Sequence, residues 1–139
     1  MKLLIIILII IGIVVAIMYL FPQINYRDMP AGLSEGHLPE GKPNWVSSKV
    51  PMTDTHYIAP LKIQSLAQLS SCIESKIPEV IIKNTDASQI IAYRPSRVFH
   101  FVDWLYIHND GAVSSSATMG HSDFGKNREL VEKIRTLCA

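Results

Sequence analysis

The first 21 residues form an almost unbroken apolar run. From Leu3 to Phe21 no residue is charged, and Gly12 alone falls outside the hydrophobic set. A helix of this length rises about 28 Å, which matches a hydrocarbon core of about 30 Å. The run therefore predicts a transmembrane anchor over residues 1–21. A cleaved signal peptide is the alternative, but five more apolar residues follow the nearest small-residue site at Ala16.

The pattern changes abruptly after the apolar run. Residues 22–43 contain four Pro and three Gly with no apolar period, which predicts a flexible linker with an r.m.s. span of about 25 Å. Residues 44–139 are left for one small domain. Lys2 precedes the span, so the positive-inside bias favours a cytoplasmic N-terminus and an extracytoplasmic domain. In a bacterium this location is the periplasmic or outer side of the inner (cytoplasmic) membrane.

Hydrophobic periodicity in the domain predicts five strands and two helices in the order β-α-β-β-β-β-α. The helices are expected at 66–77, with Ser65 as N-cap, and at 124–137, with Ser122 or Asp123 as N-cap. The strands are expected at 56–59, 79–83, 89–93, 98–107 and 112–118. Short turns between strands predict a mainly antiparallel sheet with both helices on one face, an α+β fold.

Charge and histidine spacing narrow the function classes. The chain has 13 Lys and Arg against 12 Asp and Glu, and this near-neutral balance argues against a nucleic-acid partner. The five histidines are never closer than eight residues, and no C-x-x-C occurs, so we expect neither a metal centre nor a cofactor. The histidines are His37, His56, His100, His108 and His121.

Two polar positions carry the strongest chemical hints. Strand alternation places Asp103 among apolar neighbours, where a carboxylate needs a partner such as Arg97 or Arg94; a catalytic acid or base is the less favoured alternative. The segment around Ser122 resembles a nucleophile elbow, but its glycine comes one residue too late. A helix cap is favoured there, and the helix N-terminus beside Lys126, Asn127 and Arg128 could also hold a small anion.

The two cysteines lie on the two predicted helices. An oxidising compartment permits a disulfide between Cys72 and Cys138. Bridging requires Cα atoms within about 7 Å, which the pattern cannot guarantee. The sequence therefore favours two separate buried thiols and leaves the bridge open.

Several motifs resemble the bacterial and plastid domain-of-unknown-function family 1499. The family typically reads S-P-N-C-V-S-S, D-x-x-H-x-I-x-P-L, S-R-x-F-R-F-V-D and G-Y-S-D-F-G-V-N-R. The corresponding segments here are PNWVSS at 43–48, DTHYIAPL at 54–61, SRVFHFVD at 96–103, GHSDFGKNR at 120–128 and VEKIR at 131–135. The resemblance covers residues 43–137 and implies a shared fold and an envelope location, with no established reaction.

This chain departs from the family pattern at several positions. Trp45 replaces the family cysteine. The stretch at 114–118 lacks both family arginines, and Leu130 stands at a third. If those arginines bind an anion in relatives, this copy has lost most of that site.

These observations favour a membrane-tethered extracytoplasmic binding or scaffold domain without enzymatic activity, whose partner is an envelope protein or a small anionic ligand. One alternative is an envelope hydrolase or transferase using Ser47, His56, Asp103 and Ser122; another is a small-molecule or lipid carrier. Segments 43–48 and 122–128 are expected to meet at one end of the sheet. The candidate binding or structural cluster comprises Asn44, Ser47, Ser48, His56, Arg97, Asp103, Ser122, Asp123, Asn127 and Arg128.

Overall fold

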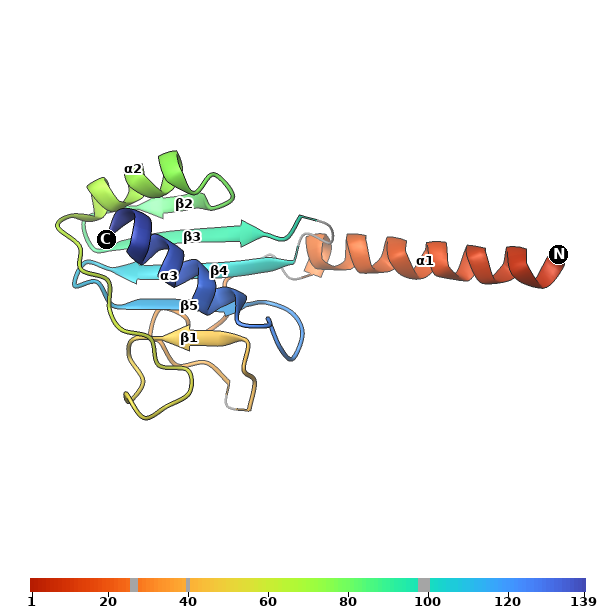
Figure 1. The fold of residues 1–139 in the computed structure, drawn as a ribbon, viewed down its shortest axis with the longest axis horizontal. Helices are drawn as coiled ribbons and strands as arrows, with labels where there is room; N and C mark the ends of the chain where they lie inside the picture. Colours follow the sequence, from red (N-terminus) through yellow and green to blue (C-terminus); the bar gives the residue numbers. More distant parts are fainter. Residues whose placement is uncertain (26–27, 40, 98–100) are drawn as a thin grey trace.

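The computed structural model describes residues 1–25, 28–39, 41–97 and 101–139. Its first element is an apolar helix, α1 (Lys2–Asn25), which extends away from the remaining elements (Figure 1). Residues Lys2–Leu20 have a mean hydropathy of 3.4 and are exposed throughout. In the described part of the chain, this is the one helix long and apolar enough to cross a membrane, a property that a signal sequence shares.

Five strands form one antiparallel sheet in the spatial order β1-β5-β4-β3-β2 (Figure 1). Strands β2 to β5 are consecutive neighbours, and β1 pairs with β5 at one edge. This arrangement confirms the predicted α+β class. The strands are β1 (Trp45–Ser47), β2 (Ile81–Thr85), β3 (Gln89–Pro95), β4 (Val102–His108) and β5 (Val113–Ala117). The first three residues of the strand predicted at 98–107 lie outside the described residues.

The first strand is not the one predicted at 56–59. Within that segment, Tyr57 makes only an isolated parallel bridge to Ser47. The Ser47 N–H donates to the carbonyl of His56, and the Ile58 N–H donates to the carbonyl of Ser47. The segment thus covers the outer edge of β1. Three residues are too few for a period-2 pattern to identify β1 from sequence.

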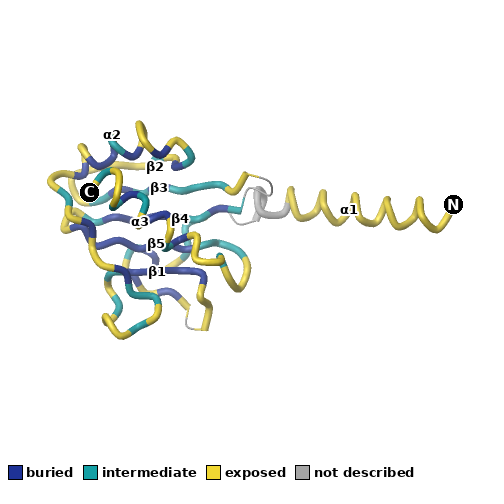
Figure 2. Tube along the Cα trace, in the orientation of Figure 1, coloured by how far each residue is buried: buried dark blue, intermediate teal, exposed yellow. Residues whose placement is uncertain are grey.

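Two helices, α2 (Leu66–Lys76) and α3 (Lys126–Cys138), cover one face of the sheet as predicted (Figure 1). Helix α2 begins after Ser65, whose Oγ accepts a hydrogen bond from the Gln68 N–H at 3.2 Å. Apolar side chains pack in the layer between helices and sheet, and Figure 2 colours the buried residues of these elements dark blue. They include Ile73, Ile90, Leu105, Ile107, Leu130 and Ile134, all with no exposed area. These side chains occupy the layer that a lipid carrier would need to leave open.

Residues 28–39 pack on the opposite face of the sheet, which corrects the expectation of a flexible linker over 22–43. Leu33 has no exposed area and Leu38 is 8% exposed. Both belong to a second core, whose other buried members are Trp45, Val102, Trp104 and Tyr106. The segment has no regular secondary structure, so its few apolar side chains follow neither a helical nor a strand period. No local pattern therefore indicated that they cover the apolar side chains of the second core.

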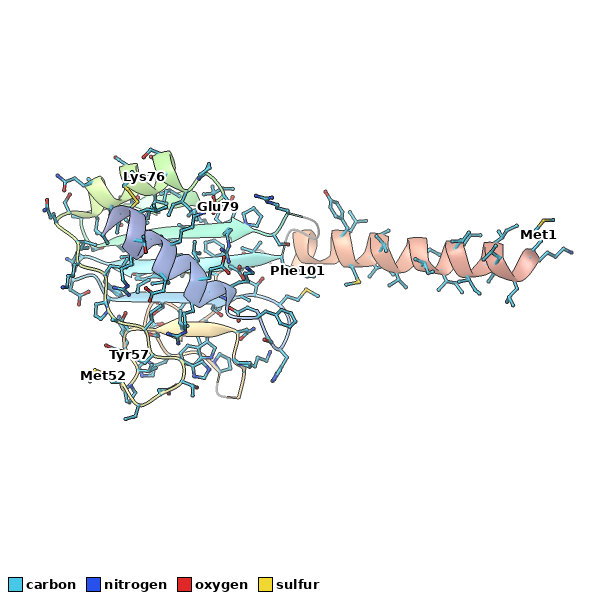
Figure 3. All side chains as sticks on the ribbon, viewed as in Figure 1. Met1, Met52, Tyr57, Lys76, Glu79 and Phe101 are labelled. Carbon is cyan, nitrogen blue, oxygen red and sulfur yellow. A yellow bond between two sulfur atoms is a disulfide. The ribbon has the colours of Figure 1, made fainter. Side chains whose placement is uncertain are left out.

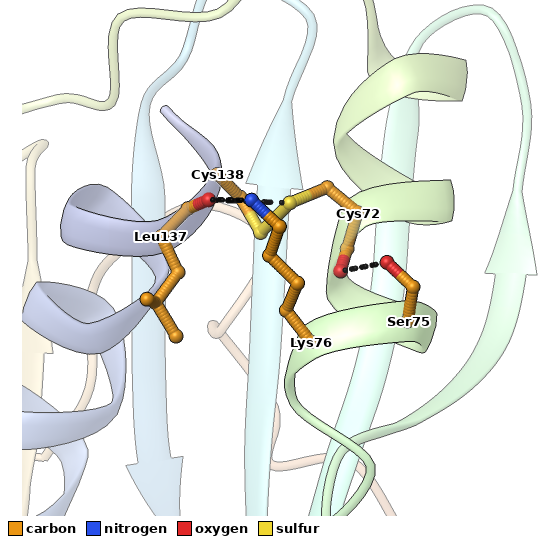
Figure 4. The surroundings of a disulfide bond; sticks show 5 residues. All are labelled: Cys72, Ser75, Lys76, Leu137 and Cys138. Carbon is orange, nitrogen blue, oxygen red and sulfur yellow. Dashed lines mark hydrogen bonds between the residues drawn. A yellow bond between two sulfur atoms is a disulfide. The ribbon is translucent and has the colours of Figure 1, made fainter.

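A disulfide between Cys72 and Cys138 joins α2 to α3 (Figure 4). The Cα atoms are 5.7 Å apart, and Lys76 Nζ donates to the Leu137 carbonyl beside the bridge at 3.1 Å. The preference for two separate thiols is therefore wrong. The helices lie side by side with both cysteines at their facing edges, a packing detail that helix periodicity alone does not determine.

One end of the sheet, called the anchor end below, lies where the chain arrives from α1 (Figure 1). It is defined by Asn44, Arg94, Asp103 and Ala117, which neighbour one another across adjacent strands. Asp28 lines a pocket at this end together with Thr118 and Asn44.

Candidate binding site at the β1 edge

Asn127 ties α3 to the start of β1 at the anchor end. Its side chain has no exposed area. Its Nδ2 donates to the Asn44 carbonyl at 3.1 Å and to Asp123 Oδ2 at 2.6 Å, and its Oδ1 accepts from Ser115 Oγ at 2.5 Å. Asn44 Nδ2 in turn donates to the Gly120 carbonyl at 3.0 Å. These contacts bring the segments 43–48 and 120–128 together.

Asp123 fills the N-terminus of α3. Its carboxylate accepts hydrogen bonds from the Gly125 N–H at 3.0 Å and the Asn127 N–H at 2.8 Å. The helix begins at Lys126, two residues later than predicted, because Gly125 has a left-handed φ of 76°. Ser122 Oγ accepts only a loop N–H, at 3.1 Å. The protein's own carboxylate thus occupies the helix N-terminus that was considered as an alternative site for a small anion.

Asp103 pairs with Arg94 on the helix-covered face. Arg94 Nη2 donates to Asp103 Oδ2 at 2.9 Å and to the Lys126 carbonyl at 3.0 Å. Burial raises the pKa of Asp103, and the Arg94 guanidinium opposes this rise without cancelling it. Arg97, the other arginine proposed as partner, is exposed in the turn after β3. The pair therefore links β3, β4 and the start of α3.

Trp45 and His56 form a stacked pair at the β1 edge. Their ring centroids are 3.8 Å apart with an interplanar angle of 10°. His56 Nδ1 lies 2.8 Å from Asp54 Oδ1, and His56 Nε2 lies 2.9 Å from the Lys42 carbonyl. Hydrogen bonds from the His56 backbone and then from its ring lower the pKa of Asp54. Both ring nitrogens are engaged, so the imidazole is held in place rather than free to accept a substrate proton.

Two pockets of about 110 and 330 Å³ are both lined by this stacked pair. Arg128 borders the smaller pocket and donates to the carbonyls of Tyr57 and Thr55 at 2.8 and 2.9 Å. The smaller pocket is also lined by Pro43, Val46, Asp123 and Gly125. The larger is also lined by His37, Leu38, Gly41, Val50, Pro51 and Asp54. We call these two pockets and the Trp45–His56 pair the β1-edge site.

The four residues of the hydrolase alternative do not assemble. Ser47 has no exposed area, and its Oγ lies 3.1 Å from Ser114 Oγ while accepting from the Lys49 N–H at 3.0 Å. Ser47 faces the side covered by residues 28–39, whereas Asp103 faces the helices near the opposite end of the strands. Ser48 Oγ accepts from the Val113 N–H at 3.1 Å, a structural contact between the residue after β1 and the start of β5.

The remaining histidines were considered as possible metal ligands. His100 lies outside the described residues. Within the described ranges, no group of three or more His, Cys, Asp or Glu side chains is placed to hold a metal ion. His108 Nε2 contacts Lys49 Nζ and the Ser34 carbonyl at 2.7 and 2.8 Å, at the end of the sheet away from the anchor end.

Sequence reasoning identified His56 and Arg128 at this site but missed Asp54 and Trp45. Asp54 precedes it by two residues, and its carboxylate accepts from the His56 N–H at 2.8 Å as well as contacting the ring. This D-x-H spacing is the local signal that could have identified the pair. Trp45 entered only as a departure from the family pattern, because nothing local to either residue predicts that Trp45 stacks on His56.

Comparison with known proteins gives a match to a family model. No curated protein and no solved structure matches the chain. A family model described as "Protein of unknown function (DUF1499)" matches residues 38–137. That range contains all five strands, α2, and α3 except its last residue. With well over half of its 139 residues matched, the chain belongs to the DUF1499 family of proteins of unknown function.

Proposed function

We propose that this protein is a single-pass protein of the inner (cytoplasmic) membrane whose domain binds a partner on the extracytoplasmic side. The length and exposure of α1 support the anchor, and Lys2 before the span supports a cytoplasmic N-terminus. The Cys72–Cys138 disulfide supports the extracytoplasmic side, since disulfides persist in oxidising compartments and are rare in the cytosol.

The observation that carries a binding role is the chemistry of the β1-edge site. His56, Asp54 and Arg128 are each engaged in hydrogen bonds within the domain. A nucleophile with an adjacent free base, which hydrolysis or group transfer needs, is not assembled from the predicted residues. Two pockets around a fixed aromatic pair instead suit recognition of a side chain from another polypeptide. An envelope protein is therefore the proposed class of partner.

Site-specific photocrosslinking tests this binding role in intact membranes. A photoreactive amino acid at Pro51, which lines the larger pocket, should give a defined crosslinked product. The same probe at Glu74, exposed on α2, serves as the matched control and should not give it. Adding His56→Ala should abolish the Pro51 product, because the stacked pair is lost. Equal products from both positions would overturn the site, and absence of any product from Pro51 would overturn the binding role.

Reporter fusions test the side of the membrane independently. A fusion at Ala139 should be active with a reporter that requires an oxidising compartment, and inactive with one that requires the cytosol. The opposite pattern would overturn the orientation and leave the β1-edge site to be judged by crosslinking.

A further inference from the structure

Phe124 is held in an unusual and costly position. Its side chain is 91% exposed and its backbone φ is 55°, a left-handed conformation that bulky residues rarely adopt. Beyond α1 it is the most exposed large apolar side chain among the described residues, the others being Met52 at 78%, Ile81 at 43% and Leu137 at 38%. The described residues leave this ring almost fully exposed, so none of them encloses it, which points to an apolar environment outside the domain.

The loop that carries Phe124 lies at the anchor end (Figure 1). It follows β5 directly, and Thr118 at its start borders the same pocket as Asp28. The helix rises about 6 Å from Phe21 to Asn25, and the three residues from Asn25 to Asp28 add at most about 11 Å. Asp28, which lines the pocket at the anchor end, is therefore tethered within about 17 Å of the hydrocarbon boundary. This limit follows from chain length alone.

The loop is fixed in place by hydrogen bonds. Asn44 Nδ2 holds the Gly120 carbonyl, and Ser122 Oγ accepts from the Phe124 N–H. The Asp123 carboxylate is turned towards the N-terminus of α3. Exposed polar residues close to Phe124 in sequence include His121 and Lys126, which suit a hydrated headgroup layer.

We propose that the loop at 118–125 inserts Phe124 into the interfacial layer of the same bilayer that α1 crosses, so that the domain docks on the lipid surface. This inference rests on the membrane anchor of the proposed function. Lys126 is paired with Glu129 at 2.6 Å, so the charge of this lysine is balanced, and the contact that Phe124 makes is apolar. The proposed occupant is therefore the lipid surface itself, without a requirement for anionic headgroups.

Tryptophan quenching in the full-length chain tests this docking. Three single variants are compared in phosphatidylcholine vesicles whose acyl chains are brominated near the headgroup. Phe124→Trp reports the loop, Leu20→Trp reports the end of the span, and Met52→Trp reports an exposed position away from α1 (Figure 3). Trp45 and Trp104 are buried and add the same background to all three.

Docking predicts strong quenching of F124W and L20W, at least twofold above M52W. If L20W is quenched while F124W matches M52W, the docking is wrong and the anchor stands. If L20W is not quenched, the anchor of the proposed function fails, and the docking fails with it. Unfolding midpoints equal to that of the parent protein should accompany each variant, because all three positions are exposed.

Discussion

At the residue scale, Asn127 shows how one buried amide fastens three segments. Its partners have other hydrogen-bond partners: the Asn44 carbonyl also accepts from the Ala117 N–H, and the single Ser115 hydroxyl proton, shared between Asn127 Oδ1 and the Trp104 carbonyl, can be donated to that carbonyl alone. Removing the amide therefore leaves none of these partners without a hydrogen bond. The expected loss is that of its three side-chain hydrogen bonds, at about 1 kcal/mol each.

We therefore expect Asn127→Ala to lower the free energy of unfolding by about 2–3 kcal/mol. Urea titration of the detergent-solubilised protein, followed by tryptophan fluorescence, measures this change. Glu74→Ala on the exposed face of α2 is the control, and should stay within about 0.5 kcal/mol of the parent. A loss for N127A no larger than for E74A would show that these contacts do not hold α3 on the sheet.

The pKa of Asp103 predicts a pH dependence at the same scale. Burial raises this pKa above the ordinary value, so the folded state holds the proton more tightly than the unfolded state. The stabilising contribution is complete below about pH 4 and is lost as pH rises through the folded-state pKa. The parent's stability relative to Asp103→Asn should consequently fall from pH 4 to pH 7.

Paired urea titrations across this range measure the difference directly. Glu79 and Asp54, whose pKa values are lowered by hydrogen bonds, titrate in both proteins and cancel. A difference that instead grows with pH would show that attraction by Arg94 outweighs burial.

At the scale of elements, the sequence predicted the caps and turns, because residues close together in the chain determine them. Ser65 caps α2 where the sequence placed it, and the turn through Asn109 and Gly111 joins β4 to β5, with Gly111 at φ 87°. The strand Trp45–Ser47 and the packing of Leu33 escaped prediction. Both depend on partners distant in sequence, namely β5 and the second core.

In the candidate site too, some contacts could be predicted from the sequence and others could not. The meeting of 43–48 with 122–128 was predicted from polar groups that needed partners, and the alternation that places Asp103 among apolar neighbours predicted an arginine partner. The stack of Trp45 on His56 depends on how the 54–58 segment folds over β1. No local pattern encodes that contact.

The disulfide is the covalent link between α2 and α3, and it closes a sequence separation of 66 residues. Constraining a loop of this length in the unfolded chain is worth about 4 kcal/mol. We expect the double variant Cys72→Ser/Cys138→Ser to lose up to about this amount in urea titration. Reductant should destabilise the parent by a similar amount and leave the double variant unchanged. Two thiols labelled in the unfolded, unreduced parent would contradict the bridge.

At the scale of the whole molecule, the boundary between anchor and domain falls earlier than the composition suggests. Residues 28–39 belong to the folded domain, because Leu33 and Leu38 cover Trp45, Trp104 and Tyr106 on the face away from the helices. In contrast, residues 2–20 of α1 are exposed along their whole length.

Two truncations separate these roles. Removing residues 1–21 should leave a water-soluble domain that unfolds cooperatively with its tryptophans buried, since no described core contact is lost. Removing residues 1–39 should also uncover the second core. The cost should be at least the 2–5 kcal/mol typical of truncating one buried leucine, and the exposed aromatics should promote aggregation. Urea titration and light scattering compare the two. Equal stability would mean that 28–39 acts as a tether after all, because a segment that contributes to the core cannot be removed without loss.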